Sequence, residues 1–185
     1  MARLTIKKIA EIMVKVYNLD PDSLPFVQGR LKNFNAKLGI LRAEESNDHH
    51  RTRTLDEIGA AEAVLFSELA DMGFDAQILR EVREHLDRNP IGMELICNPE
   101  AFRSMEKPRF EMRLYRDNSP VTMRHYSIVT FDEPKSRASK TLDNRDIYEK
   151  QLASVLTIDL GILLDAFLFE FGQVVIYGDR RESGE

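Results

Sequence analysis

Apolar residues recur three or four positions apart in four short stretches of residues 1–89, and polar segments separate these stretches. This spacing places apolar side chains on one face of a helix. We therefore expect four short amphipathic helices. Their predicted core faces are Ile6, Ile9, Ala10 and Met13 in the first; Val27, Leu31, Phe34 and Leu38 in the second; Ile58, Ala61, Leu65 and Leu69 in the third; and Ile78, Leu79, Val82 and Leu86 in the fourth.

Residues that favour helix ends lie at the borders of these stretches. Side-chain oxygens that accept hydrogen bonds from free backbone amides cap helix N-termini. The predicted caps are Thr5, Asp22 or Ser23, Thr54 and Asp75. Thr54 and Glu57 have the spacing of a capping box. Gly39 is expected to end the second helix, and Pro90 prevents the fourth from continuing.

Beyond Pro90 the helical spacing gives way to alternation. Phe110, Met112 and Leu114 alternate with charged residues, which predicts a strand. Turn-forming residues at 117–120 and the β-branched and aromatic stretch 121–131 predict a hairpin. Residues 146–171 are predicted to be mostly helical, with a short strand at 173–177. We expect an α+β chain with a four-helix domain at 1–89, a domain of a β-hairpin plus a long apolar helix at 90–178, and a charged tail at 179–185.

The predicted C-terminal helix is apolar on nearly all sides, and one hairpin cannot cover it. An uncovered apolar surface of this kind marks an interface or a ligand site. We expect a second copy of the chain to cover it, with a small apolar ligand pocket as the alternative. Asp159, Asp165 and Glu170 make a membrane span unfavourable. The expected dimerisation residues are Leu152, Leu156, Leu160, Leu163, Leu164, Phe167 and Leu168.

Charge is distributed unevenly along the chain, whose net charge is −5. Residues 1–54 contain ten Lys and Arg against six Asp and Glu, whereas residues 55–185 contain sixteen against twenty-five. A basic first third joined to an acidic remainder favours an anionic partner for the N-terminal domain.

The sequence offers little for catalysis or metal binding. Cys97 is the single cysteine, which excludes a disulfide framework, a four-cysteine zinc site and an iron–sulfur cluster. His49 and His50 are adjacent and cannot easily bind one ion together. No nucleophile elbow, phosphate loop, dinucleotide fingerprint or zinc-protease motif occurs. We expect a protein that is not an enzyme and has no cofactor or metal. Without a signal-peptide core, we also expect it in the cytoplasm.

The second helix carries polar residues suited to DNA. Arg30, Asn33 and Lys37 fall on one stripe beside its apolar face. Arg can donate two hydrogen bonds to guanine, and Asn can pair with adenine. The stripe therefore predicts a contact in the major groove, with an ordinary solvated helix face as the alternative. A rotated helix would present Lys32 and Asn35 instead.

The polar segment 42–53 has no apolar periodicity and predicts an exposed loop or hairpin. A basic hairpin beside such a helix can grip the phosphates of DNA. The residues expected near the DNA backbone are Lys32, Arg42, His49, His50, Arg51 and Arg53.

Four landmarks in this order resemble the MerR family of winged helix-turn-helix regulators, over residues 4–88. Ile9-Ala10-Glu11 resembles the start of the family's first helix, and residues 32–41 (KNFNAKLGIL) resemble its second helix. Residues 51–58 (RTRTLDEI) resemble the exit of the wing, and Gly73-Phe74 followed by Ile78 resembles the start of the fourth helix. The resemblance implies a winged helix-turn-helix domain that binds double-stranded DNA as a homodimer.

Together these features predict a sequence-specific, DNA-binding transcriptional regulator, with a homodimeric repressor as the expected form. Its effector, a small molecule or a protein, is not identified by the sequence. One alternative is an architectural or excision factor of a mobile element, which would bend DNA without controlling transcription. Another is a protein-interaction module that captures a partner with the C-terminal apolar helix.

Overall fold

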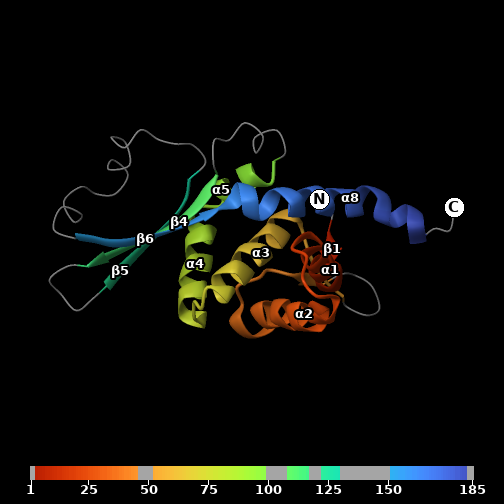
Figure 1. Cartoon of the computed structure of the whole chain (residues 1–185), viewed down its shortest axis with the longest axis horizontal. Helices are drawn as coiled ribbons and strands as arrows, with labels where there is room; N and C mark the ends of the chain where they lie inside the picture. Colours follow the sequence, from red (N-terminus) through yellow and green to blue (C-terminus); the bar gives the residue numbers. More distant parts are fainter. Residues whose placement is uncertain (1–2, 46–51, 99–107, 117–121, 130–150, 183–185) are drawn as a thin grey trace.

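Helices pack beside two small antiparallel sheets in this α+β chain (Figure 1). The computed structural model describes residues 3–45, 52–98, 108–116, 122–129 and 151–182. The N-terminal elements are β1 (Leu4–Thr5), α1 (Ile6–Val16), a 3₁₀ turn (Pro21–Ser23), α2 (Leu24–Asn33), a π-helical turn (Phe34–Leu38), β2 (Glu44–Glu45), β3 (Arg53–Leu55), α3 (Glu57–Asp71) and α4 (Ala76–Arg88). The C-terminal elements are α5 (Ile91–Ile96), β4 (Arg109–Arg116), β5 (Thr122–Val129), β6 (Gln151–Asp159) and α8 (Leu160–Glu182).

The four predicted N-terminal helices are confirmed. Thr5 caps α1 by accepting a hydrogen bond from the amide of Lys8, and Asp75 caps α4 through the amides of Gln77 and Ile78. Gly39 follows the π-helical turn with a φ of 67°, a left-handed conformation that Gly adopts at little cost. The apolar faces are buried as expected, apart from Leu38, Ile58 and Ile78, which are half-buried.

The cap of the third helix differs from the prediction. Asp56, not Thr54, accepts the hydrogen bond of a free amide, that of Gly59 at 2.8 Å. Thr54 lies in β3, where it pairs with Thr5 of β1 and Glu44 of β2. The backbone must stay extended through Leu55 to complete this ladder, so the helix begins two residues later than the capping box implies.

The first sheet has the order β1-β3-β2, with all neighbours antiparallel. Because β1 leads directly into α1, the central strand β3 lies beside the start of that helix. Arg3 donates a hydrogen bond of 2.6 Å to Glu44, which ties β1 to the first strand of the hairpin. The sheet thus holds β2 and β3 against the first turn of α1.

The second sheet confirms the predicted hairpin and adds a third strand. β4 pairs with β5 and also with β6, in the order β5-β4-β6. The predicted helix is therefore confirmed over residues 160–171 and wrong over 151–159, and the strand predicted at 173–177 is wrong because the helix continues through it. Residues 151–159 are strand and 160–182 are helix. Ser154, Leu156 and Ile158 are two positions apart, so they share one face of the strand. Asp159 caps α8, because its carboxylate accepts a hydrogen bond from the amide of Ile162 at 3.0 Å.

Helix α8 runs along α3 and α1, so the C-terminal half covers the N-terminal helices (Figure 1). Its residues Leu160, Leu164, Phe167 and Phe171 are fully or almost fully buried within this chain. The Tyr17 hydroxyl donates to the carbonyl of Leu163 at 2.7 Å. One continuous core spans both halves, so the predicted boundary at residue 89 does not separate two cores.

This packing corrects the expected dimerisation residues. Leu160, Leu164 and Phe167 contact their own chain and offer nothing to a partner. Leu163 and Leu168 are half-buried against the same core, and so is Leu156 of β6. Leu152 lies in β6 rather than on a helix. The error comes from treating the hairpin as the only cover for α8. Within the described part of the chain, no helix is long and apolar enough to cross a membrane.

Candidate nucleic-acid interface

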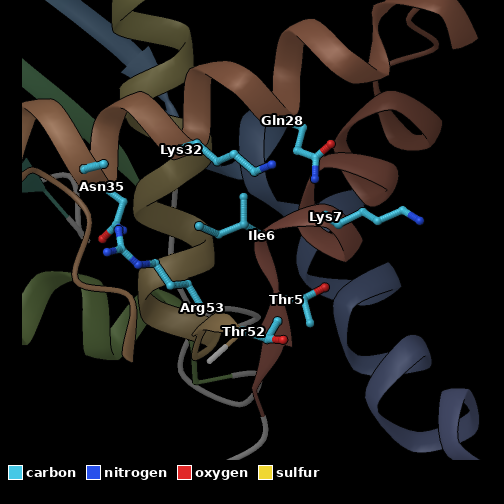
Figure 2. A pocket seen from close by; sticks show the side chains of 9 residues that line it. Thr5, Ile6, Lys7, Gln28, Lys32, Asn35, Thr52 and Arg53 are labelled. Carbon is cyan, nitrogen blue, oxygen red and sulfur yellow. The ribbon is translucent and has the colours of Figure 1, made fainter. Parts of the chain in front are cut away.

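A concavity of about 610 Å³ lies between α2, the first turn of α1 and the start of β3 (Figure 2). We call it the basic concavity. Gln28, Lys32, Asn35 and Ala36 line it from α2 and the π-helical turn. Thr5 of β1 and Ile6 and Lys7 of α1 form a second wall, and Thr52 and Arg53 form a third at the start of β3.

Each wall follows from the local fold. Gln28, Lys32 and Asn35 are four and three positions apart, so they share one flank of α2. The buried Val27, Leu31 and Phe34, each one position earlier and so about a quarter turn around the helix, hold the neighbouring side of α2 and the π-helical turn against the core. Pairing of β3 with β1 carries Arg53 to the same opening.

The electrostatics favour an anion. Three of the nine lining residues, Lys7, Lys32 and Arg53, are cations, and none is Asp or Glu. The first turn of α1 also presents free backbone amides and the positive end of the helix dipole. Lys7 forms an ion pair with Glu11 of the same helix at 3.9 Å, and Glu11 also pairs with Lys8 at 3.2 Å. Lys32 is exposed and makes no ion pair with a described residue.

Asn35 links α2 to the hairpin. With its amide oriented to satisfy both polar ends, its nitrogen donates to the carbonyl of Leu41 at 3.0 Å and its oxygen accepts from Arg53. Figure 2 shows the two side chains meeting at the edge of the concavity. The predicted DNA-binding residue Asn35 is therefore half-buried, and it orients Arg53 rather than facing outward.

Arg30 does not fit the predicted role in the groove. Its guanidinium donates to Asp71 of α3 at 2.6 Å and to the carbonyl of Ser67 at 3.5 Å. It also lies 4.8 Å from the centre of the Phe26 ring. Only 19% of the side chain is exposed. Arg30 braces α2 against α3, which the helical stripe alone could not reveal because Asp71 is 41 residues away.

Asn33 and Lys37 remain exposed on the flank that they share with Arg30, around a hollow of about 680 Å³. Arg42 is exposed but forms an ion pair of 2.5 Å with Asp87 of α4. The predicted contacts His49, His50 and Arg51 lie outside the described residues. Sequence reasoning missed Gln28 and Lys7, although their spacing from Lys32 and Thr5 placed them near these elements.

A buried charge cluster supports the base of the hairpin. Arg83 of α4 bonds to Glu62 of α3 and to Asp87, both at 2.5 Å, and Asp87 also holds Arg42. Burial raises the pKa of Glu62 despite the nearby Arg83. For Arg83, the two carboxylates outweigh the effect of burial and raise its pKa. The cluster keeps α3, α4 and the segment that enters β2 in one arrangement.

Two other kinds of chemistry considered from the sequence are a reactive cysteine and a metal site. Cys97 is buried, and burial raises the pKa of its thiol, which disfavours the reactive thiolate. Among the described residues, no group of three or more His, Cys, Asp or Glu is placed to hold a metal ion. Comparisons with protein-family models, with curated proteins and with solved structures find no match for this chain.

Proposed function

We propose that this chain is a homodimeric DNA-binding transcriptional regulator with a winged helix-turn-helix domain of the MerR type. The observation that carries the proposal is the basic concavity, which combines an exposed helix, a helix N-terminus and the base of a hairpin without a lining carboxylate. The element order β1-α1-α2-β2-β3 also supports the proposal, because it brings the antiparallel strands β2 and β3 directly after the helix that would contact DNA.

In this proposal α2 enters the major groove with Lys32 and Asn33, which are exposed on the side away from Val27 and Leu31. Lys can hydrogen-bond guanine, and Asn can pair with adenine. Lys7 and Arg53, which line the basic concavity on one flank of this helix, grip phosphates there. Arg30 is no longer a base-reading residue, because its ion pair with Asp71 holds it against α3.

The second copy binds along α8. Ile162, Phe169 and Ile176 are 83%, 68% and 61% exposed, and they repeat at intervals of seven residues on the face opposite the buried Leu164 and Phe171. The stripe is symmetric about Phe169, so an antiparallel copy would match Ile162 with Ile176. A two-fold contact needs this kind of self-complementary surface. A dimer would also place two α2 helices on one pseudo-palindromic site.

Selection of genomic DNA fragments by the full chain tests the proposed function. We expect enrichment of a pseudo-palindromic sequence. Asn33→Ala should cost about 1–3 kcal/mol of binding free energy at that site and relax selectivity at one base pair. Arg88→Ala, on the exposed end of α4, is the control and should bind like the wild type. Recovery of fragments without a common sequence would contradict sequence-specific binding.

Light scattering tests the dimer. Phe169→Glu should give a monomer that binds the full site much more weakly, since each half-site then binds alone. Ile91→Glu replaces another exposed apolar residue, outside α8, and should leave the dimer intact. If both variants keep the mass of a dimer, α8 is not the interface.

A further inference from the structure

Another cavity, of about 190 Å³, lies where α1, α2, α3 and α8 meet. We call it the Ser67 cavity. Its walls are mainly apolar and include Met13, Val27, Val64 and Leu163. An apolar cavity of roughly 150 Å³ is large enough to bind benzene. The Ser67 cavity therefore has room for a ligand with a single ring.

The polar group at its wall lacks a partner. Ser67 is 4% exposed, and its hydroxyl oxygen has no hydrogen-bond partner in the structure. Buried hydroxyls are normally hydrogen-bonded, and an unsatisfied one costs free energy. A ligand that hydrogen-bonds Ser67 would remove this cost.

The charges of the lining residues indicate whether a ligand of the cavity should be positive or negative. Glu68 and Asp71 of α3 both line it, together with Arg30. Arg30 is already paired with Asp71 at 2.6 Å. No described residue donates a hydrogen bond to the Glu68 carboxylate or forms an ion pair with it. The cavity thus has one uncompensated negative charge beside an apolar space.

Tyr17 lies on the same wall but is already engaged. Its hydroxyl donates to the carbonyl of Leu163, and burial together with the nearby Glu68 carboxylate raises its pKa. A tyrosine hydroxyl never carries a positive charge, so Tyr17 cannot balance the charge of Glu68. It leaves Glu68 and Ser67 as the free polar groups of the cavity.

We propose that the Ser67 cavity binds a small organic cation, a protonated primary amine on an apolar body about the size of one ring. The ammonium group pairs with the Glu68 carboxylate and donates a hydrogen bond to the Ser67 hydroxyl. The ring packs against Val27 of α2, Val64 of α3 and Leu163 of α8.

This site has a consequence that rests on the proposed DNA-binding function. Glu68 and Asp71 are three positions apart, so their carboxylates are neighbours on α3. An ammonium at Glu68 competes with Arg30 for Asp71 and loosens the brace that holds α2 against α3. The amine should therefore weaken DNA binding.

Titration calorimetry of the full chain without DNA tests the site, with 2-phenylethylamine as the probe. The neutral 2-phenylethanol and the anionic 3-phenylpropionate are controls of similar size. We expect saturable 1:1 binding of the amine, at least about tenfold tighter than that of either control, because a charged hydrogen bond is lost in both.

Matched variants locate the site. Glu68→Gln keeps the shape of the side chain and should weaken amine binding about tenfold or more, and Ser67→Ala should weaken it less. Glu94→Gln, on the exposed surface of α5, makes the same charge change elsewhere and should have no effect. The proposal is overturned if none of the three compounds binds, if the alcohol or the acid binds as tightly as the amine, or if Glu68→Gln binds like the wild type.

A separate measurement tests the coupling. Fluorescence anisotropy with a selected DNA fragment should show lower affinity in saturating amine, and Glu68→Gln should abolish the difference. Amine binding in calorimetry with no DNA binding at all would contradict the proposed function and leave the site intact. DNA binding that is unaffected by a bound amine would contradict the coupling alone.

Discussion

Arg30 provides a sharp test of how α2 is held, because the sequence and the structure give it different roles. We choose Arg30→Met, which keeps an apolar stem and removes the guanidinium. Three interactions are lost: the ion pair with Asp71, the 3.5 Å hydrogen bond to the carbonyl of Ser67 and the contact with the Phe26 ring. Asp71 is exposed, so the ion pair contributes about 0.2–1 kcal/mol. The cation–π contact adds about 0.5–1 kcal/mol.

The free energy of unfolding should therefore fall by about 1–2 kcal/mol, as measured by urea denaturation followed by circular dichroism. Lys32→Met is the control, since Lys32 is exposed on the same helix and forms no ion pair with a described residue; its effect should stay within about 0.5 kcal/mol. A double-mutant cycle of Arg30→Met with Asp71→Asn should give a coupling energy of about 0.5 kcal/mol. The brace would be refuted if Arg30→Met is as stable as Lys32→Met and the coupling energy is zero.

Three further changes test the rest of the fold. Asp56→Ala should cost about 1 kcal/mol of stability in thermal unfolding, because it removes the cap of α3, whereas Thr54→Ala should cost clearly less. A larger loss for Thr54→Ala than for Asp56→Ala would mean that Thr54 is the cap after all. Glu62→Ala leaves the buried charge of Arg83 without one of its two partners and should cost about 3 kcal/mol; a loss near zero would mean that the cluster adds nothing. Glu81 of α4 accepts hydrogen bonds from Arg124 and Tyr126 of β5. These bonds outweigh burial and hold the pKa of Glu81 below its usual 4.5, so the stability from this α4–β5 contact is present above pH 4.5 and is lost as the pH falls through the lowered pKa. Glu81→Gln should make unfolding less sensitive to acid, and an unchanged pH profile would contradict this contact.

The sequence predicted the elements whose signals are local. Helix faces, the caps Thr5 and Asp75, Gly39 and the β4–β5 hairpin depend on residues within a few positions of one another. Residues 151–159 were misread because Leu156 and Ile158 fit an apolar helix as well as a strand. Only pairing with β4, some forty residues earlier, decides between the two.

For the candidate site too, the sequence predicted the local features and missed those that depend on long-range contacts. Periodicity put Arg30, Asn33 and Lys37 on one flank of α2, and the structure brings them together there. Periodicity within α2 could not show that Arg30 forms an ion pair with Asp71, because that contact joins two different helices. The basic concavity also depends on β3 lying beside α1, which is a long-range pairing.

The salt dependence of DNA binding tests the central claim most directly. Affinity for the selected site should fall linearly with salt on logarithmic axes, by roughly 0.9 log units for each phosphate neutralised. Lys7→Ala and Arg53→Ala should each lower this slope by about one, whereas Arg88→Ala, which does not line the basic concavity, should leave it unchanged. Equal slopes for all three variants, or binding that does not respond to salt, would contradict an interface at the basic concavity.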